Sequence, residues 1–308
     1  MLDVHQLNVF LVAAETLNFT QAAARLHMTQ PSISQHVQSL EQYFDQKLFI
    51  RSGRHIRLSA AGEALLPLAR DLVNRAISIE ETMKSLEGEV HGHLLVGCST
   101  TPGKYILPHL LARFHGLHPR VTLSCHVASQ TQALQMVCDD EAHFALVSVS
   151  DLPCNYLEMK RFMMDPVMLI APLGHPWATR QEIEPEELVQ AQFILREAGS
   201  GTQETVRQGL DEIGIDMGQL KTLLVLGNSE AIAIAVQEGL GVGFVSSIVY
   251  TRLVQGRVAP VRVRGLQLER EICIARNMRR MPTAAQASFW EFINAVDDPI
   301  AATETQMA

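Results

Sequence analysis

The spacing of hydrophobic residues near the start of the chain predicts two short helices. Leu7, Phe10, Leu11 and Ala14 recur at helical spacing within residues 5–16, which is typical of an amphipathic helix. A second helix is expected over residues 21–26, with Thr20 as its N-cap because a hydroxyl there accepts a backbone N–H. His27 and Met28 follow as a tight connection to the next element.

A third helix is predicted over residues 30–44. Thr29 or Gln30 caps it, and Pro31 lies in the first turn, where its missing N–H costs nothing. Its buried stripe is expected to comprise Ile33, Val37, Leu40 and Phe44. The residues left facing outward are polar, namely Ser32, Ser34, Gln35, His36 and Gln38. Two helices joined by a short turn, the second of which begins with small polar residues, indicate a helix-turn-helix whose recognition helix is 30–44.

Two short strands are predicted next, over 47–51 and 54–58, on either side of a Ser-Gly turn, and together they form a β-hairpin. Arg51, Arg54 and Arg57 lie along it, which is typical of a wing that follows phosphates or enters a minor groove. The alternative is a small helical subdomain with solvated arginines.

The charge distribution favours the DNA interpretation. The 308-residue chain carries a net charge of −8, which excludes a general cationic coating for nucleic acid. Residues 1–57 nevertheless hold five basic and four acidic side chains, a net charge of +1. Hydrophobic residues make up 47% and charged residues 19% of the chain, a composition that indicates a globular protein and excludes a disordered one. A polyanion would therefore bind at the N-terminal corner.

Residues 60–88 show the heptad spacing of one long helix. Apolar positions recur at alternating steps of four and three residues: Leu65, Ala69, Leu72, Ala76, Ile79, Met83 and Leu86. Such a narrow seam favours a partner helix, so we expect dimerisation through Leu65, Leu72, Ile79, Met83 and Leu86. The alternative is a helix buried against its own domain, although such helices usually show a wider apolar stripe. Gly88 and Gly92 then supply a flexible boundary.

From residue 93 onward, apolar β-runs alternate with helical stretches, which implies parallel sheets with crossover helices in an α/β region. The expected strands are Leu94–Cys98, Val121–Val127, Phe144–Val149, Val167–Ala171, Phe193–Leu195, Thr222–Leu226, Val242–Val245, Val258–Val263 and Glu271–Ala275. The expected helices are 103–116, 130–138, 185–190, 202–213, 228–238, 246–253 and 283–296.

Hydroxyl and glycine residues follow several of these strands at points where a helix begins. We expect them to hold a small anion, because helix starts present unpaired N–H groups. The predicted contacts are Ser99, Thr100, Thr101, Ser129, Thr131, Ser200, Gly201, Thr202, Ser229 and Ser246. The Gly-Ser-Gly-Thr turn at 199–202 makes the most compact nest of donors. The alternative is that each is an ordinary helix cap.

Other chemistries find little support in the sequence. The twelve histidines form no clustered ligand set, and motifs for hydrolases, dinucleotides and ATP do not occur. The five cysteines are scattered and odd in number, so a disulfide framework is not expected and a reducing cytoplasm fits best. Cys98 and Cys125 are alternatively redox sensors or, more commonly, buried apolar residues. The N-terminus shows no signal peptide, and no apolar run reaches the 18 residues that indicate a membrane span.

The N-terminal sixty residues resemble, without a gap, the DNA-binding domain of the LysR-type transcriptional regulators. The resemblance rests on Phe10, on the runs 19–26, 30–35, 40–41 and 48–51, on Arg54, and on 58–62. It implies a winged helix-turn-helix, a linker helix that dimerises antiparallel, and two Rossmann-like lobes similar to periplasmic binding proteins. Ser59 stands where Thr is common, and His36 and Gln38 occupy variable positions, which affects the operator sequence rather than the assignment. The DNA contacts expected are Thr20, Thr29, Gln30, Ser32, Ser34, Gln35, Arg51 and Arg54.

We therefore expect a winged helix-turn-helix over 1–59, a linker and hinge over 60–92, and an effector domain over 93–308. Its first lobe would comprise 93–165 and 266–296, its second 166–265, with the effector between them. The run 196–202 resembles regulators of carbon-fixation and sulfur-assimilation operons.

The predicted function is promoter control in response to a small anionic effector, by a cytoplasmic homodimer or homotetramer that is not an enzyme. A phosphorylated sugar, an organic acid or a sulfur metabolite is expected as effector, with promoter DNA and RNA polymerase as partners and no cofactor. The alternatives are a solute-binding protein or enzyme with an accessory winged domain, and an architectural DNA binder without a ligand.

Overall fold

The structure is a computed structural model that describes residues 1–52, 55–86, 88–148 and 152–296. Contacts divide the chain into two compact units, Met1–His91 and Gly92–Ala308, and each is described by itself. None of the described helices is long and apolar enough to cross a membrane.

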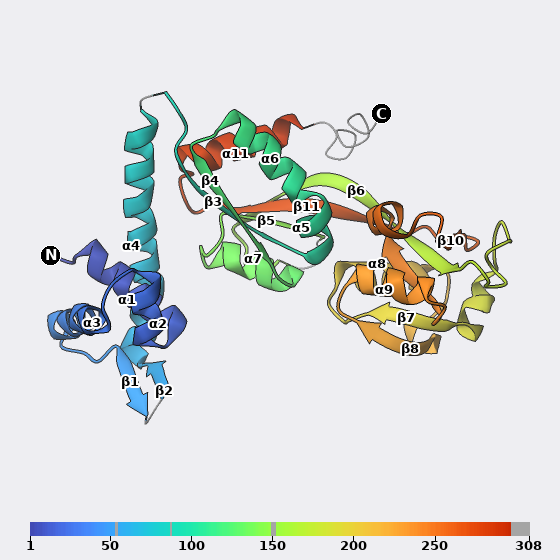
Figure 1. Cartoon of the computed structure of the whole chain (residues 1–308), viewed down its shortest axis with the longest axis horizontal. Helices are drawn as coiled ribbons and strands as arrows, with labels where there is room; N and C mark the ends of the chain where they lie inside the picture. Colours follow the sequence, from blue (N-terminus) through green and yellow to red (C-terminus); the bar gives the residue numbers. More distant parts are fainter. Residues whose placement is uncertain (53–54, 87, 149–151, 297–308) are drawn as a thin grey trace. The chain divides into compact units, whose positions relative to one another are not determined.

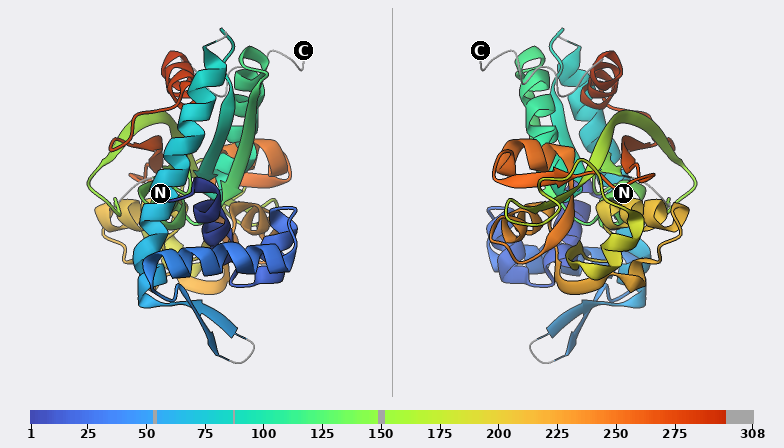
Figure 2. Two further views of the ribbon diagram at one scale, coloured as in Figure 1. Left: turned by 90° about the vertical axis from the view of Figure 1, so that its left-hand side faces the viewer. Right: turned by 90° about the vertical axis from the view of Figure 1, so that its right-hand side faces the viewer.

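The N-terminal unit consists of three short helices, a two-stranded hairpin and one long helix (Figure 1). Its elements are α1 (Val4–Thr16), α2 (Phe19–Arg25), α3 (Gln30–Phe44), β1 (Phe49–Ser52), β2 (His55–Leu58) and α4 (Ala60–Ser85). The predicted 5–16, 30–44 and hairpin elements are thereby confirmed. Figure 2 shows the hairpin extending away from the three short helices.

Each helix of this unit begins at a side-chain cap. Asn18, not Thr20, caps α2: its side-chain oxygen accepts from the N–H groups of Thr20 and Gln21 at 2.9 and 3.2 Å. The Thr20 prediction was wrong because Asn caps at least as well as Thr, and α2 begins two residues earlier than the pattern suggested. Thr29 caps α3, as one of the two predicted alternatives, by accepting from Ser32 N–H at 3.3 Å.

A buried carboxylate holds the turn between α3 and the hairpin. Glu41 accepts from the N–H groups of Leu48 and Phe49 at 2.9 and 3.4 Å, and Lys47 pairs with it at 2.7 Å. Burial would raise the pKa of Glu41, but the hydrogen bonds from Lys47 and the two backbone groups outweigh it, and the pKa lies below its ordinary value. The hairpin is thus fixed relative to α3 by one side chain.

The long helix α4 is buried only near its start. Ala69 and Val73 are buried and Leu65 packs against the core of the N-terminal unit. The later seam residues are exposed, with exposed fractions of 38%, 65%, 61% and 71% at Leu72, Ile79, Met83 and Leu86. The first turns of α4 are therefore buried against their own domain, which was the alternative to dimerisation. The rest of the heptad seam has no partner within the described chain.

The C-terminal unit contains a nine-stranded sheet with helices on its faces (Figure 1). Its strands are β3 (Gly92–Cys98), β4 (Val121–Val127), β5 (Phe144–Ser148), β6 (Leu157–Pro172), β7 (Gln192–Arg196), β8 (Lys221–Leu226), β9 (Val242–Ser246), β10 (Val258–Val261) and β11 (Glu269–Asn277). Its α-helices are α5 (Thr100–Tyr105), α6 (Leu107–Leu117), α7 (Gln130–Cys138), α8 (Gly201–Glu212), α9 (Ser229–Gln237), α10 (Ser247–Val249) and α11 (Ala284–Ala295). Three further turns are the 3₁₀ helices η1 (Pro185–Gln190) and η2 (Met217–Gln219) and the π-helix η3 (Tyr250–Val254).

The sheet is mixed, not purely parallel as predicted. Its strand order is β4-β3-β5-β11-β6-β9-β7-β8, with β10 paired to β6. The β3–β4, β3–β5, β7–β8 and β7–β9 pairs are parallel. The long strands β6 and β11 run antiparallel to each other and to their other neighbours. The two parallel groups thus conform to the alternating pattern, and the strands that join them do not.

Several element bounds differ from the prediction for local reasons. The expected helix 103–116 is two helices, α5 and α6, because Pro108 lies in the first turn of α6 and cannot donate to the preceding turn. The expected strand Val167–Ala171 begins ten residues earlier, at Leu157. The predicted helix 246–253 is the short α10 followed by η3. Position 149, predicted to end a strand, lies outside the described residues.

Cys138 and Cys154 form a disulfide, contrary to the expectation from their scattered positions. The last residue of α7 and the loop before β6 bring the two Cα atoms within 6.3 Å. The sequence separation of 16 residues gave no sign of this contact, because the intervening strand β5 folds back only in the tertiary structure. Cys98, Cys125 and Cys273 are free.

Candidate nucleic-acid interface and effector site

The outer face of α3 carries the polar side chains predicted to contact DNA. Ile33, Val37 and Leu40 are buried on the inner face, with exposed fractions of 3% or less. Gln30 and Gln35 are exposed, and Ser32 and Ser34 are half-buried. The Gln30 side-chain amide donates to Ser34 Oγ at 2.8 Å, which orders the first turn. A helix with one face in the core and such an outer face can lie in a major groove.

A small hollow lies beside this face. It has a volume of about 280 Å³, and its lining includes Ser34, Gln38, Glu41 and Lys47. The apolar part of its lining consists of Phe19, Val37 and Phe49. Lys47, which lines this hollow, has an exposed side chain. The outer face of α3 and the start of the wing therefore share one polar surface that includes the Lys47 ammonium group.

The other predicted DNA contacts differ in their position and exposure. Thr20 is exposed in the first turn of α2, and the Thr29 hydroxyl already accepts the α3 cap hydrogen bond. Arg51 lies in β1 opposite Ile56. Arg54 lies outside the described residues. Arg57, on β2, is exposed.

In the C-terminal unit, the start of α8 lies very close to two other elements. Ser200 caps α8 by accepting from Gln203 N–H at 3.1 Å. An ideal Cβ on Gly201 would lie 2.8 Å from Ser148 Cβ and 3.1 Å from Gln130 Oε1. Gln130 Oε1 is buried and accepts no hydrogen bond from the described residues. The end of β5, the start of α7 and the start of α8 therefore meet at one point, where only glycine fits.

Thr202 belongs to a buried ionic network that sequence analysis missed. Arg270, on β11, donates to Thr202 Oγ1 at 2.9 Å and pairs with Asp165, on β6, at 2.7 and 2.8 Å. The predicted site residue Ser246 donates to Asp165 at 2.7 Å. Asp165 is fully buried and Arg270 is 7% exposed. No local signal in the sequence marked this network, since Asp165 and Arg270 both lie just outside the strands predicted at Val167–Ala171 and Glu271–Ala275.

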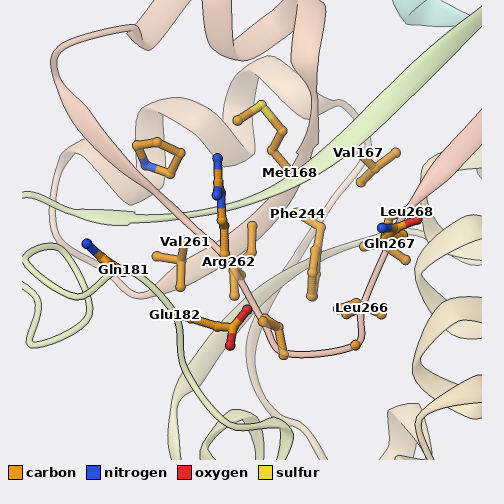
Figure 3. A pocket seen from close by; sticks show the side chains of 14 residues that line it. Val167, Met168, Gln181, Glu182, Phe244, Val261, Arg262, Leu266, Gln267 and Leu268 are labelled. Carbon is orange, nitrogen blue, oxygen red and sulfur yellow. The ribbon is translucent and has the colours of Figure 1, made fainter.

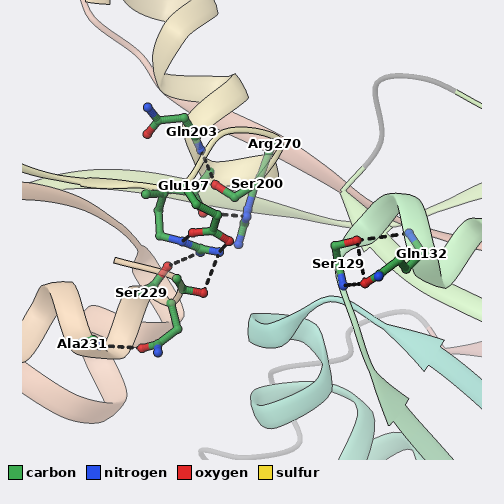
Figure 4. Close-up of polar contacts among 12 residues, drawn as sticks. Ser129, Gln132, Glu197, Ser200, Gln203, Ser229, Ala231 and Arg270 are labelled. Carbon is green, nitrogen blue, oxygen red and sulfur yellow. Dashed lines mark hydrogen bonds and ion pairs between the residues drawn. The ribbon is translucent and has the colours of Figure 1, made fainter. Parts of the chain in front are cut away.

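A second buried arginine holds Ser229. Arg196, at the end of β7, donates to Ser229 Oγ at 3.1 Å and pairs with Glu197 at 2.7 Å (Figure 4). Asn228, not Ser229, caps α9, by accepting from Ala231 N–H at 2.7 Å. Burial raises the pKa of Glu197, but the hydrogen bond and positive charge of Arg196, together with a backbone hydrogen bond, outweigh it, and the pKa lies below its ordinary value.

The remaining predicted effector residues do not join this network. Ser129 forms a capping box with Gln132, and Figure 4 shows the pair apart from Ser200 and Ser229. Thr131 is exposed, Ser99 and Thr100 are half-buried, and Thr101 is buried. Ser99 occupies the N-cap position of α5 without a side-chain hydrogen bond to that helix.

One ion pair joins α5 to α9. Lys104, on α5, pairs with Glu230, on α9, at 3.0 Å. Burial and the negative charge of Glu230 raise the pKa of Tyr105, which lies beside the pair. Sequence analysis missed this contact because the partners are more than a hundred residues apart.

A cavity larger than the hollow beside α3 lies elsewhere, in the C-terminal unit. It has a volume of about 630 Å³ and is lined by residues of β6, β10 and the segment 262–268 (Figure 3). Its lining contains none of the predicted effector residues. Among the described residues, no group of three acidic, histidine or cysteine side chains could hold a metal ion.

Comparison with known protein families decides the identity of both units. Residues 4–63 match the bacterial regulatory helix-turn-helix protein family of LysR type, and residues 87–298 match the LysR substrate binding domain. The chain belongs to the LysR family. It is a LysR-type transcriptional regulator with an effector-binding domain, and its relatives are regulators rather than enzymes.

Individual LysR relatives refine this assignment. A RuBisCO operon transcriptional regulator from Acidithiobacillus ferrooxidans is 32% identical over 269 residues, covering 87% of this chain and 85% of the relative. This match confirms the resemblance to carbon-fixation regulators.

Two solved LysR structures share the fold. Full-length CbnR in complex with its target DNA superposes with a TM-score of 0.67 at 23% identity, covering 95% of this chain and 99% of CbnR. The regulatory domain of CcmR from Synechocystis PCC6803, in complex with 2-PG, has a TM-score of 0.62 at 25% identity and covers 68% of this chain and 99% of that domain. The predicted winged helix-turn-helix joined to an α/β effector domain is thus confirmed.

Proposed function

We propose that this LysR-type regulator reads its operator with the outer face of α3. Gln30, Ser32, Ser34 and Gln35 supply amide and hydroxyl groups that hydrogen-bond to base edges and phosphates. The observation that carries the proposal is the division of α3 into a buried apolar face and an exposed polar face. Thr20 and Thr29 at the helix starts and Arg51 and Arg54 in the wing contact the backbone of the duplex.

The regulator dimerises through α4. Leu72, Ile79, Met83 and Leu86 are large apolar side chains on an exposed helix, and together with Leu65 they repeat at heptad spacing. Burial of such a seam against a second α4 removes apolar area from water. A dimer, or a tetramer built from two of them, presents two recognition helices to two half-sites.

A small anionic metabolite binds in the C-terminal unit between the lobes 93–165 with 266–296 and 166–265, at the first turn of α8. Three features support this site: the N–H groups at the start of a twelve-residue helix, the buried Thr202 hydroxyl, and the unpaired Gln130 oxygen facing Gly201. Ser99, Thr100, Thr101, Ser129, Thr131, Ser229 and Ser246 complete the set at neighbouring strand ends. A phosphorylated two-carbon acid such as 2-phosphoglycolate is the first candidate, because it is the ligand of the CcmR domain.

The buried arginines favour an anion over a cation. Arg270 donates to Thr202, and Arg196 donates to Ser229. Each hydroxyl oxygen thereby accepts one hydrogen bond from an arginine, which favours turning its own proton toward an acceptor such as an anionic ligand. We place the protein in the cytoplasm, where it meets promoter DNA and RNA polymerase.

Titration of labelled operator DNA, with and without 2-phosphoglycolate, tests both halves of the proposal. Gln35→Ala should reduce discrimination between operator and random DNA, whereas Thr202→Val should keep basal binding and lose the response to the metabolite. Thr251→Val is the matched control for the second variant, because Thr251 is exposed in η3 and its hydroxyl donates to the backbone oxygen of Ser247 at the start of α10.

A thermal-shift measurement shows whether the metabolite binds directly. At 100 times its dissociation constant it should stabilise the wild type by about 2.7 kcal/mol. Normal discrimination in Gln35→Ala contradicts the α3 assignment, and a normal metabolite response in Thr202→Val contradicts the α8 assignment.

A further inference from the structure

Two free thiols lie in contact at the end of β3. Cys98 Sγ and Cys125 Sγ are 3.3 Å apart, and the two residues lie on neighbouring parallel strands of the same sheet. Cys98 is buried, whereas Cys125 is exposed on β4, the edge strand of the sheet. The Cys125 sulfur is therefore accessible to reagents in solution, and the buried Cys98 sulfur lies in contact with it.

We propose that Cys98 and Cys125 form a reversible disulfide when the protein meets a hydroperoxide. The Cys125 thiolate attacks the peroxide, the O–O bond breaks, and the sulfur becomes a sulfenic acid while an alcohol or water leaves. The Cys98 thiol then attacks this sulfenic acid, an S–S bond forms, and water leaves with the Cys98 proton. The two sulfurs lose two electrons in total, and the peroxide gains them. A dithiol reductant reverses the change by thiol–disulfide exchange.

The arrangement of the two sulfurs assigns a different role to each. The two sulfurs lie within hydrogen-bonding distance, so the Cys98 S–H can donate to a Cys125 thiolate, and this favours the anionic form of Cys125. This hydrogen bond lowers the pKa of Cys125 to about 7, whereas the same bond and burial raise the pKa of Cys98. A thiolate is the nucleophile in such reactions, and an ordinary cysteine has a pKa of about 8.5. Cys125 is therefore the attacking residue and Cys98 the resolving one.

Closing the bond disturbs α5. The two sulfurs must approach each other by about 1.3 Å to reach the length of a disulfide. Cys98 Sγ lies against Gly103 of α5, where an ideal Cβ would come within 2.5 Å of it. A shift of this sulfur changes what the helix packs on, and α5 also carries Lys104, the partner of Glu230 on α9. Oxidation is thus expected to loosen α5 and the contact it makes with α9.

Peptide mapping after differential alkylation tests the disulfide directly. Wild-type protein is treated with hydrogen peroxide and then unfolded in denaturant so that every free thiol is blocked. It is then cleaved with trypsin and chymotrypsin, which separates Cys125 from Cys138 at Leu134. We expect a peptide pair joined through Cys98 and Cys125, lighter by two hydrogens, that disappears on reduction. Cys273 should remain fully alkylated, since it is buried without a second free thiol beside it.

Three variants separate the two roles. Cys98→Ser should stop at the sulfenic acid of Cys125, which a sulfenic-acid trap captures, and Cys125→Ser should show no oxidation at Cys98. Cys273→Ser, the matched control, should behave as the wild type. Circular dichroism confirms that each variant is folded before it is oxidised. The rate of Cys125 alkylation should reach half its maximum near pH 7 in the wild type.

Several outcomes overturn the proposal. They are full alkylation of both cysteines after peroxide, equal oxidation of Cys98 in Cys125→Ser, and a disulfide between Cys125 residues of two copies seen on a non-reducing gel. Hydrogen exchange tests the consequence for α5: amides of residues 99–106 should exchange faster in oxidised wild type than in oxidised Cys125→Ser. Equal exchange in the two would remove the link to α5. None of these measurements requires an effector or DNA, so they stand apart from the proposed function.

Discussion

The two candidate sites of this regulator are built over very different stretches of chain. The DNA-binding surface draws on residues 20–57, and its recognition helix is fixed by a cap and a proline within its own first turn. The network around Thr202 joins Asp165, Ser246 and Arg270, which are up to 105 residues apart. The comparison teaches that a site on one helix is visible in a sequence pattern, whereas a site held by paired buried charges becomes visible only in the fold.

Breaking the Asp165–Arg270 pair should give the largest effect of all. Asp165→Ala leaves Arg270 buried and uncompensated, which we expect to lower the free energy of unfolding of the C-terminal unit by about 3–5 kcal/mol. Both tryptophans, Trp177 and Trp290, lie in that unit, so their fluorescence during urea unfolding reports on it alone.

The exposed pair Arg161–Glu271 provides the control for this measurement. Glu271→Ala removes one partner of a 3.5 Å ion pair that is open to solvent, and should cost less than about 1 kcal/mol. Equal losses in the two variants would show that the buried network is no more important to the fold than a surface pair. The double variant Asp165→Leu/Arg270→Met should recover much of the stability.

The corresponding change in the N-terminal unit is Glu41→Gln. It removes the carboxylate that accepts from Leu48 and Phe49 and pairs with Lys47, and should cost about 1.5–3 kcal/mol at neutral pH. The folded-state pKa of Glu41 is lowered, so its contribution is complete above the unfolded-state pKa and is lost as the pH falls through the folded-state pKa. The difference between wild type and variant should therefore shrink in acid.

Helical circular dichroism during urea unfolding, below and above about pH 4, measures this shrinkage. Glu63→Gln, in the exposed first turn of α4, is the control and should cost less than about 1 kcal/mol at either pH. A pH-independent difference for Glu41→Gln would mean that shape, not charge, holds the turn.

Two glycines allow a further comparison between the units. A Cβ on Gly62 would lie 2.2 Å from the backbone oxygen of Leu48, so Gly62→Ala should destabilise the N-terminal unit by about 1–3 kcal/mol. At Gly201 the nearest atom, Ser148 Cβ, would lie 2.8 Å away and moves only with its backbone, so Gly201→Ala should also destabilise, but less than Gly62→Ala because the clash is less close. Gly116→Ala, on α6 with no atom within 4 Å, should instead stabilise by about 0.5–1 kcal/mol. Thermal unfolding ranks the three, and a different order contradicts these contacts.

The smallest expected effect concerns one exposed arginine of the wing. Arg57→Ala should leave folding unchanged and weaken binding to all DNA sequences alike. If Arg57 contacts one phosphate, the slope of log affinity against log salt should fall by about 0.9. Arg75→Ala, on α4 and paired with Asp71, is the control and should not change the slope. If the slope is also unchanged in Arg57→Ala, the prediction that Arg57 contacts a phosphate is wrong.

The sequence predicted the recognition helix to the residue because its limits are local. Thr29 and Pro31 define its start, and its apolar face recurs at helical spacing. The same argument failed where a local rule had a competitor: Asn18 capped α2 in place of Thr20, and Pro108 divided a helix that looked continuous. The heptad seam was predicted as one surface, but Leu65 joins the core of its own unit while Leu86 is exposed.

The parts that escaped prediction depend on contacts between distant segments. β6 begins ten residues before its predicted start because the polar run around Lys160 and Arg161 pairs with β11, a partner more than 110 residues later in the chain. Arg270 and Arg196 carry no local mark that distinguishes them from solvated arginines. Their partners, Asp165 and Ser229, are supplied by the tertiary structure.

The antiparallel pair β6–β11 determines how the two parallel strand groups can move. Sliding of one strand along the other would break a ladder that runs from Glu269 opposite Pro166 to Asn277 opposite Leu157. Bending of the two-stranded ribbon across its thickness breaks none of these hydrogen bonds, and the ladder already has an irregularity between Ile272 and Cys273 where such a bend concentrates. The two-stranded connection therefore resists sliding and stretching of its strands but bends easily. We therefore expect bending of this ribbon to be the easiest motion between the two groups of parallel strands.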